Sequence, residues 1–424
     1  MTSTDAATPT IGPADALVFE LLATPEGRAD PYPRYARLQE HWPVHRLVFE
    51  APGSSPGGTW VLSRFDHCQA VLRHPRLGKD FVAMQRRWGL AEGELAAQQA
   101  FSAARPSMLF SDPPDHTRLR GLVAKAFTPR TVEALRPQVL RLTDEVLDTI
   151  GDGETDVMAT LAFPLPVKVI GEMLGVPPAD RPQFQGLVRA SAASLEPFVS
   201  PEVLATSNAA TLEMEEYFRH LAVERRRDPG PDLFSQLIAA EDDGDQLSEL
   251  ELLSSAILLF AAGFETTTNL IGNGLLALLR HPDQLERLRR DPSLMPSAVE
   301  ELLRYDSPVQ VNGRIALDDV EVDGHPFPAG STVLTLLGAA NRDPRRFPDP
   351  HRLDVGRRDG ASMSFGSGIH FCLGAALARL EGQVVFGRLL ERYSRIELLD
   401  DSPRYRDSIT LRGLAELPVR LHAA

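Results

Sequence analysis

Residues 364–374 read Ser364-Phe365-Gly366-Ser367-Gly368-Ile369-His370-Phe371-Cys372-Leu373-Gly374, a glycine-rich segment that contains a single thiol. The residues that follow, 375–393, carry apolar side chains every three or four positions, which predicts a long helix. Cys372 should therefore lie just before a helix N-terminus, where free backbone N–H groups and the helix dipole stabilise a thiolate. A thiolate presented by such a turn can bind a metal.

The cysteine content of the chain narrows the choice of metal. Only two cysteines are present, and Cys68 lies far from Cys372 in the sequence. A structural zinc site needs four ligands, so zinc is a poor candidate. One sulfur ligand with space opposite suits heme iron, and Gly374 would let a flat ligand approach the backbone. A buried structural cysteine beside a turn is the plainer alternative.

The pattern Phe365-Gly366-x-Gly368-x-His370-x-Cys372-x-Gly374 resembles the heme-binding loop of the cytochrome P450 monooxygenases at every defined position. The resemblance covers almost the whole chain from around Asp30 onward. It implies a mainly α-helical fold with small β-sheets (α+β), in which a long central helix lies over the heme. It also implies heme b (iron protoporphyrin IX) as the cofactor, with Cys372 as the metal ligand and with cofactor contacts from Phe365, Gly366, His370 and Gly374.

Composition and charge limit the class of protein. The 424 residues are 43% hydrophobic, which is enough for a large core, and the net charge of −14 argues against nucleic-acid binding. The N-terminus lacks the basic and apolar regions of a secretory signal, and two cysteines form no disulfide framework, so we expect a cytoplasmic protein. Residues 1–15 are expected to be a flexible tail, and residues 16–424 a single heme-thiolate monooxygenase domain.

A long apolar segment lies between residues 248 and 280. It is about as long as a membrane span requires. However, Glu265, Asn269 and Asn273 would then lie near the bilayer centre, where polar groups are unfavourable. The segment therefore predicts a buried helix of roughly 50 Å and no membrane span.

The centre of this predicted helix reads Ala262-Gly263-Phe264-Glu265-Thr266-Thr267 and resembles the oxygen-activation segment of the family. Gly263 weakens the helix at this point. The resemblance implies that Glu265 and Thr266 are the catalytic residues, which would relay the protons that cleavage of the O–O bond consumes. The alternative is that the threonines bond back to the preceding turn while Glu265 faces solvent.

A helix predicted over residues 299–305 carries Glu301 and Arg304 on one face, where an isolated pair would be an ordinary surface ion pair. The family has a Glu-x-x-Arg pair that meets a second arginine from a later Pro-x-Arg segment. Pro350-His351-Arg352 occupies that place, although Leu353 stands where the family usually has phenylalanine. The resemblance implies that Glu301, Arg304 and Arg352 support the heme loop structurally.

The two heme carboxylates need basic partners when they are buried. By resemblance, His116 and Arg120 form the propionate-binding pair, and they share one face of a predicted helix. Arg314 and His370 would complete the set. The alternative for each residue is a solvated or capping side chain.

The remaining segments predict short elements around these motifs. Strands are expected at residues 60–62, 320–324 and 333–336, and helices at 65–73, 131–150 and 211–227. Substrate contacts are expected by resemblance from the loop over the heme and from three other segments, with core packing as the alternative for each residue. These candidates are Phe81, Met84, Trp88, Ala262, Phe264, Val309, Gln310, Val311, Thr410 and Leu411. Residues 194–198 could form a lid, and Glu196 and Gln310 could recognise polar groups.

The resemblance implies an enzyme that inserts one oxygen atom of O2 into a C–H bond by hydroxylation or epoxidation. Its substrate would be a hydrophobic small molecule, such as a polyketide, macrolide or terpenoid intermediate of secondary metabolism. The heme domain leaves no residues for a flavin or nicotinamide domain, so a ferredoxin and a ferredoxin reductase should donate electrons. Two alternatives are a peroxide-driven heme-thiolate enzyme, against which Glu265 and Thr266 count, and a heme-binding sensor or carrier without turnover.

Overall fold

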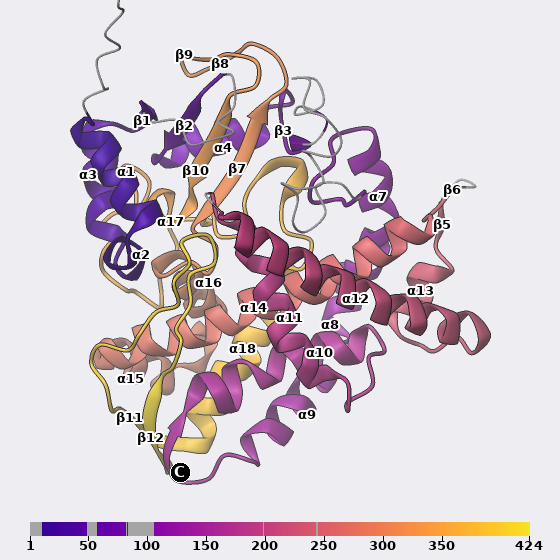
Figure 1. Ribbon diagram of the computed structural model, residues 1–424. Coiled ribbons are helices and arrows are strands. Elements are labelled where there is room, and N and C mark those ends of the chain that lie inside the picture. Colours follow the sequence, from indigo (N-terminus) through magenta and orange to yellow (C-terminus); the bar gives the residue numbers. More distant parts are fainter. Residues whose placement is uncertain (1–10, 49–56, 82, 84–105, 198, 243–244) are drawn as a thin grey trace, which may run out of the picture.

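A computed structural model describes residues 11–48, 57–81, 83, 106–197, 199–242 and 245–424. Helices dominate these residues, and small sheets lie at the edges of the helical body (Figure 1). The mainly helical fold with small sheets that the sequence predicted is therefore confirmed.

The longest helix, α14 (Glu249–Arg280), runs through the middle of the structure (Figure 1). It begins at a capping box in which Ser248 and Glu251 exchange side-chain and backbone hydrogen bonds. Four helices pack against it and cover its apolar surface: α10 (Pro164–Met173), α12 (Pro201–Arg227), α16 (Met295–Tyr305) and α18 (Ala375–Arg392). The largest hydrophobic core surrounds this contact.

The remaining helices lie around this central group (Figure 1). The α-helices are α1 (Pro13–Ala23), α2 (Pro25–Ala29), α3 (Tyr32–His41), α4 (Phe65–Arg73), α7 (Asp115–Ala124), α8 (Pro129–Glu133), α9 (Arg136–Leu147), α11 (Phe184–Ala192), α13 (Leu233–Ile238), α15 (Pro282–Arg290) and α17 (Leu337–Ala340). Short 3-10 turns are η1 (Lys125–Phe127), η3 (Arg181–Gln183), η4 (Ala193–Leu195), η5 (Pro292–Leu294) and η6 (Gly368–His370), and η2 (Met158–Ala162) is a π turn.

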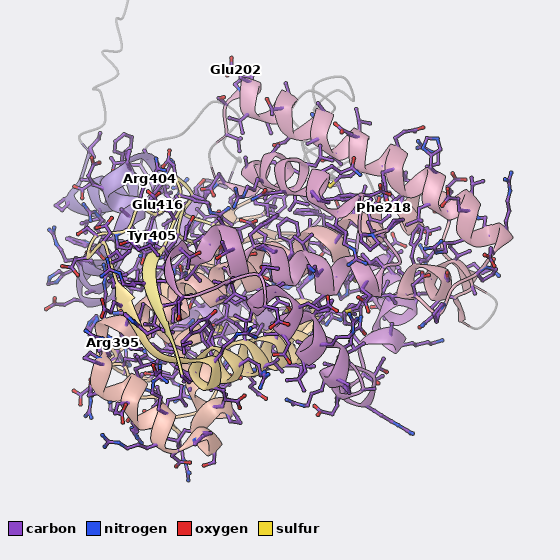
Figure 2. All side chains as sticks on the ribbon, turned by 90° about the horizontal axis from the view of Figure 1, so that it is seen from below. Glu202, Phe218, Arg395, Arg404, Tyr405 and Glu416 are labelled. Carbon is purple, nitrogen blue, oxygen red and sulfur yellow. The ribbon has the colours of Figure 1, made fainter. Side chains whose placement is uncertain are left out.

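An aromatic cluster joins α12 to the helices beneath it. Phe218 of α12 is fully buried and packs against Phe184, Phe234 and Phe260. Figure 2 shows Phe218 within the helical body, whereas Glu202 lies at the outer end of the same helix. This contact holds α11, α12 and α14 together on one side of the fold.

The main sheet joins segments from both halves of the chain. Its strand order is β1 (Val44–Arg46), β2 (Thr59–Leu62), β10 (Thr332–Leu336), β7 (Val311–Ala316) and β3 (Leu77–Gly78). Strands β2 and β10 are parallel, and the other neighbours are antiparallel. Because β7 pairs with β3, the segment that precedes residue 80 lies beside the strand that carries Arg314.

A second sheet of three strands lies near the C-terminus (Figure 1). Its middle strand is β12 (Pro418–Ala423), which pairs with β11 (Tyr393–Leu398) on one side and β4 (Gly153–Asp156) on the other. Two hairpins complete the strands: β5 (Glu241–Asp242) with β6 (Asp245–Gln246), and β8 (Val320–Val322) with β9 (His325–Phe327).

The element boundaries correct three expectations. The helix expected over residues 131–150 is two helices, α8 and α9, which are separated at residues 134–135. Pro137 has no N–H to donate to the carbonyl of Glu133, but it is tolerated in the first turn of α9. The helix expected from residue 211 begins ten residues earlier, at Pro201, in a proline-first helix capped by Ser200. Helix α1 begins at Pro13, within the range expected to be a tail.

One helix among the described residues, α14, is long and apolar enough to cross a membrane. However, 72% of its most apolar window is buried inside the protein. Its apolar residues therefore pack against other helices, as in the core helix of a soluble fold.

Candidate functional site

The cysteine loop is a compact turn closed by its own backbone. The N–H of Cys372 donates to the carbonyl of Phe365 over 3.0 Å, and the N–H of Gly366 donates to Met363 over 2.8 Å. Gly366 and Gly368 adopt φ angles of 71° and 75°, in the left-handed region that favours glycine. A side chain at Gly368 would also collide with the carbonyl of Leu72. The loop conformation therefore depends on glycine at both positions.

The Cys372 thiol lies ahead of α18 and is solvent-accessible, although many protein atoms surround it. Burial raises its pKa, whereas the Gly374 N–H, Arg120 and Arg379 act in the opposite direction. The Gly374 N–H at the helix end therefore acts in the predicted direction, but burial outweighs it. A coordinated metal ion would deprotonate the thiol outright.

The space beside the loop fits a flat group. Apart from each glycine and its two chain neighbours, no atom of the described residues lies within 4 Å of the position that a Cβ would occupy at Gly366 or Gly374. Near the same loop, the Nε2 atoms of His116 and His370 and the Nε of Arg314 are buried without hydrogen-bond partners in the described structure. Unpaired N–H groups of this kind suit carboxylates. One thiol, open backbone and unpaired donors together match the donor set that heme b requires.

The four residues predicted to bind propionates converge here. The rings of His116, from α7, and His370 lie 4.3 Å apart between centroids. Arg314, from β7, is buried, and Arg120 donates to the carbonyl of Phe371 over 2.6 Å. Burial and the neighbouring cations lower the pKa of His370 to about 2, and burial lowers that of Arg314 to about 10. Burial and the nearby Arg120 lower the pKa of His116 as well, so the surroundings of both histidines favour the neutral ring.

The accessible part of α14 is short. Between residues 251 and 278 every residue is buried except Ala261, Ala262, Gly263 and Thr266. Ala262 and Thr266 are one turn apart, so they share a face, and the Thr266 hydroxyl donates to the Ala262 carbonyl over 2.9 Å. Gly263 lies against Ile170 of α10, so its missing side chain permits close helix packing and does not mark a ligand path.

Glu265 lies on the buried side of α14. Its carboxylate forms an ion pair with Arg406, and its Oε2 atom has no hydrogen-bond partner in the described part of the chain. Arg406 also donates to Oδ1 of Asn269 over 3.0 Å. Consecutive helix residues point about 100° apart, which separates the Glu265 and Thr266 side chains. The alternative interpretation of this segment is wrong for Glu265, which does not face solvent. It is right for Thr266, whose hydroxyl does bond to the carbonyl of the preceding turn.

The buried support of the heme loop differs in one residue from the prediction. Glu301 and Arg304 form two hydrogen bonds of 2.6 and 2.8 Å, and Arg304 donates to the carbonyls of Asn341 and Pro350. The second arginine on Glu301 is Arg357, at 3.1 Å. The side chain of Arg352 is exposed, and only its carbonyl joins the network. Arg357 lies beyond the Pro-x-Arg pattern, so the motif selected the wrong residue.

The predicted pocket residues divide into three groups. Ala262 is accessible, Val309 and Leu411 are half-buried and pair in an isolated bridge, and Phe81 is half-buried near Gly313. Four residues are buried core or network positions and do not line an accessible surface: Phe264 packs on Phe163, Gln310 bonds Ser307 and Tyr32, Val311 joins a core cluster, and Thr410 donates to Leu195. Met84 and Trp88 lie outside the described residues.

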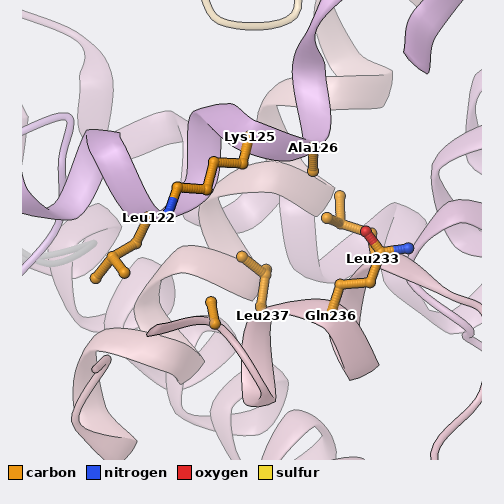
Figure 3. Close-up of a pocket in the computed structure, with 7 residues that line it drawn as sticks. Leu122, Lys125, Ala126, Leu233, Gln236 and Leu237 are labelled. Carbon is orange, nitrogen blue, oxygen red and sulfur yellow. The ribbon is translucent and has the colours of Figure 1, made fainter. Parts of the chain in front are cut away.

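The surface hollow in Figure 3 is a separate feature. It measures about 170 Å³ and lies between the α7–η1 segment and α13, where Leu122, Lys125, Leu233 and Leu237 contribute to its lining. None of the predicted site residues lines it. The hollow therefore has no part in the cysteine site.

Three comparisons with known proteins agree with this geometry. The family model described as "Cytochrome P450" matches residues 97–414. The chain is 44% identical to cytochrome P450 monooxygenase PikC of Streptomyces venezuelae, over 92% of this chain and 91% of that protein. It is 43% identical to 6-deoxyerythronolide B hydroxylase of Saccharopolyspora erythraea, over 92% and 96%.

Solved structures show the same similarity in three dimensions. The tirandamycin C-bound P450 monooxygenase TamI superposes with a TM-score of 0.83 at 42% identity, covering 94% of this chain and 99% of that one. The bacillaene polyketide synthase cytochrome P450 PksS of Bacillus subtilis gives 0.84 at 40% identity, covering 94% and 98%. With its thiol loop, cationic cluster and long central helix, the chain belongs to the cytochrome P450 family.

Proposed function

We propose that this P450 monooxygenase oxidises its substrate between the Cys372 loop and the accessible face of α14. Heme b, when bound, supplies the redox chemistry that divides O2 between the substrate and water. Cys372 would ligate the iron, and Phe365, Gly366 and Gly374 would border the ring. The observation that carries this proposal is that α14, between residues 251 and 278, is accessible only around Ala262 and Thr266.

In this proposal Thr266 and Glu265 handle protons. The Thr266 hydroxyl uses its hydrogen on the Ala262 carbonyl, which leaves its oxygen lone pairs to accept a hydrogen bond. Glu265 is an acid held on the other side of the same turn by Arg406. Protons that arrive from solvent at Glu265 would pass to Thr266 through water.

The experiment that tests this role compares Thr266→Ala with Thr267→Ala, whose parent hydroxyl bonds the Gly263 carbonyl on the buried side. We expect Thr266→Ala to divert reducing equivalents to hydrogen peroxide, measured as peroxide formed per NADH consumed. Thr267→Ala should remain coupled. Fully coupled turnover in Thr266→Ala would refute the relay.

The proposed substrate class is a hydrophobic secondary metabolite, a polyketide, macrolide or terpenoid intermediate, that is hydroxylated or epoxidised. The support comes from the relatives, whose names include a 6-deoxyerythronolide B hydroxylase and a tirandamycin C complex. A spectroscopic screen of such compounds for displacement of the water ligand of the heme iron would identify the substrate. Binding confined to another class of compound, such as simple fatty acids, would contradict the proposal.

The proposed electron donors are a ferredoxin and its reductase in the cytoplasm, and residues 16–424 are proposed to act as one domain. Ile369 and Phe371, which lie on either side of His370 in the cysteine loop, are 51% and 41% exposed and offer an apolar contact for a partner. Phe371→Ala should raise the KM for ferredoxin severalfold. Leu399→Ala, at an equally exposed residue after β11, is the matched control and should leave that KM unchanged.

A peroxide-driven enzyme and a non-catalytic sensor or carrier remain as alternative functions. Turnover with hydrogen peroxide, but none with O2 and the redox chain, would favour the first alternative. Product formation that tracks NADH consumption would exclude the second.

A further inference from the structure

The loop that follows η4 is joined to the segment between β11 and β12 by one carboxylate. Glu196 accepts hydrogen bonds from the Ser408 hydroxyl and from the N–H groups of Ile409 and Thr410, over 2.5 to 3.2 Å. The Thr410 hydroxyl also donates to the carbonyl of Leu195 over 3.0 Å. Hydrogen bonds to an ionised carboxylate are shorter and stronger than those between neutral groups. Glu196 therefore fixes three successive residues of the segment 406–413, which we call the C-terminal turn.

The C-terminal turn is closed by its own hydrogen bonds. The N–H of Ser408 donates to the carbonyl of Arg406 over 2.9 Å, and the N–H of Arg406 donates to the carbonyl of Gly413 over 2.9 Å. The Ser408 hydroxyl oxygen also accepts the N–H of Leu411 over 3.1 Å. Since these bonds join Ser408 to both sides of the turn, a displacement of Ser408 also displaces Arg406.

The guanidinium of Arg406 ends at α14. It forms the ion pair with Glu265 and donates to Oδ1 of Asn269 over 3.0 Å. The turn packs closely on the helix here, because a Cβ at Gly413 would lie 1.9 Å from that same oxygen. Glu265 and Arg406 also act electrostatically on Arg189 of α11. A second cation is therefore near Glu265, so the direction of its carboxylate depends on where Arg406 is held.

Glu196 itself lies outside this contact. Its hydrogen bonds among the described residues go to the C-terminal turn, and none of them goes to α14. An effect of Glu196 on Glu265 must therefore pass through the turn. The path has two hydrogen-bonded steps, from Glu196 to Ser408 and from the Ser408 N–H to the backbone of Arg406. The Arg406 side chain then reaches Glu265.

We propose that Glu196 is a positioning residue for Glu265 and acts on it through Ser408 and Arg406. With the loop after η4 in contact with the C-terminal turn, as in this structure, Arg406 is fixed and the Glu265 carboxylate is held. When that loop moves away, the turn loses three hydrogen bonds and Arg406 is no longer fixed, so proton delivery is impaired while the site is open. The proposal rests on the proposed role of Glu265 in proton delivery and makes that role depend on closure of the loop.

The first measurement is the yield of hydrogen peroxide per NADH consumed in the holoenzymes of Glu196→Ala, Glu196→Gln and Ser194→Ala. Ser194→Ala is the control, because the Ser194 hydroxyl donates within the same loop, to the carbonyl of Ser191 over 2.7 Å. We expect a severalfold higher yield in Glu196→Ala and a smaller rise in Glu196→Gln, which keeps one acceptor oxygen. Ser194→Ala should match the parent. A parental yield in Glu196→Ala would overturn the proposal.

An open loop could also raise the peroxide yield by admitting water, and a double variant separates the two causes. If Glu196 acts through Arg406, Glu196→Ala should add little to the peroxide yield of Arg406→Ala. Independent effects would multiply in the double variant, and that result would also overturn the proposal.

A crystal structure of ferric Glu196→Ala gives a readout that does not depend on turnover. We expect the Arg406 guanidinium to have left Glu265 or to occupy alternate positions, and an intact ion pair at parental occupancy would refute the positioning role. The proposed relay fails separately, since fully coupled Thr266→Ala refutes the relay. Uncoupled Thr266→Ala together with a parental peroxide yield in Glu196→Ala refutes only the positioning role.

Discussion

Glu265, in the middle of α14, forms an ion pair with Arg406 from the segment between β11 and β12. Their side chains are 3% and 21% exposed, so the carboxylate is buried while its guanidinium partner is partly exposed. The same segment contacts a second acid, because Glu196 accepts hydrogen bonds from Ser408, Ile409 and Thr410. One short turn therefore contacts both the central helix and the loop that follows η4.

Replacing Arg406 by alanine would leave the Glu265 carboxylate buried without its cation. We expect the free energy of unfolding to fall by about 1–3 kcal/mol and the coupling of NADH consumption to product to fall with it. Denaturant unfolding and product assays across pH check the two effects. Arg404→Ala is the control, since Arg404 forms a solvent-exposed pair with Glu416 at 3.7 Å near Tyr405 (Figure 2). Arg406→Lys should restore coupling in part; no rescue would contradict a positioning role for the cation.

The buried Glu301 network predicts a difference between two arginines. Arg357→Ala removes a guanidinium from Glu301 and should reduce both heme loading and the free energy of unfolding, by about 1–3 kcal/mol. Arg352→Ala should have little effect on either quantity. The Arg352 side chain is exposed, and the variant keeps the backbone carbonyl that accepts the hydrogen bond from Arg357. The ratio of heme to protein in purified variants, with denaturant midpoints, gives the comparison. Equal losses in both variants would contradict the assignment.

The loop after η4 is held against the C-terminal turn by Glu196. Oε1 of Glu196 accepts from the Ser408 hydroxyl over 2.5 Å and from the Thr410 N–H over 3.2 Å, and Oε2 accepts from the Ile409 N–H over 3.2 Å. Glu196→Ala should loosen this contact, so that association and dissociation rates of a probe such as phenylimidazole both rise severalfold while its Kd changes little.

Stopped-flow absorbance of the heme measures both rates. Glu202→Ala, at the exposed end of α12, is the control and should not alter them (Figure 2). An altered Kd with unchanged rates of association would instead indicate that Glu196 contacts the probe directly.

Glu381 of α18 predicts a pH effect on stability. Burial raises its pKa well above the ordinary value, and its Oε2 lacks a hydrogen-bond partner among described residues. The folded chain thus binds this proton more tightly than the unfolded chain does. Its contribution is greatest below the ordinary glutamate pKa and is lost as the pH rises through the raised pKa.

Glu381→Gln removes the cost of ionising this carboxyl. We expect the free energy of unfolding to rise by about 1–3 kcal/mol near neutral pH and to fall less steeply with pH. Denaturant midpoints between acidic and mildly alkaline pH test this. Glu391→Gln, at an exposed residue of the same helix, is the control. A destabilised Glu381→Gln at neutral pH would show that the charged form makes a contact the structure lacks.

The sequence predicted the parts of the site that are local in the chain. The cysteine loop, the polar centre of α14 and the Glu301–Arg304 pair each lie within a few residues, so a motif contains most of their geometry. Arg406 comes from a segment far from Glu265, and no spacing rule connects the two residues. The resemblance predicts Phe264 and Gln310 in the pocket, but both are buried in the structure, because the motif gives a segment and not the face to which each side chain points.

The place of β12 in the C-terminal sheet has a consequence for biosynthesis. β12 is the last strand in chain order, yet it lies between β4 and β11 and supplies hydrogen bonds to both. While the ribosome makes the rest of the chain, β4 therefore presents an unpaired edge, which is a site for association with other nascent chains. Folding of this part finishes only after translation has passed β12, so variants with a weakened final strand should accumulate as aggregates in cells before any loss of heme chemistry is measurable.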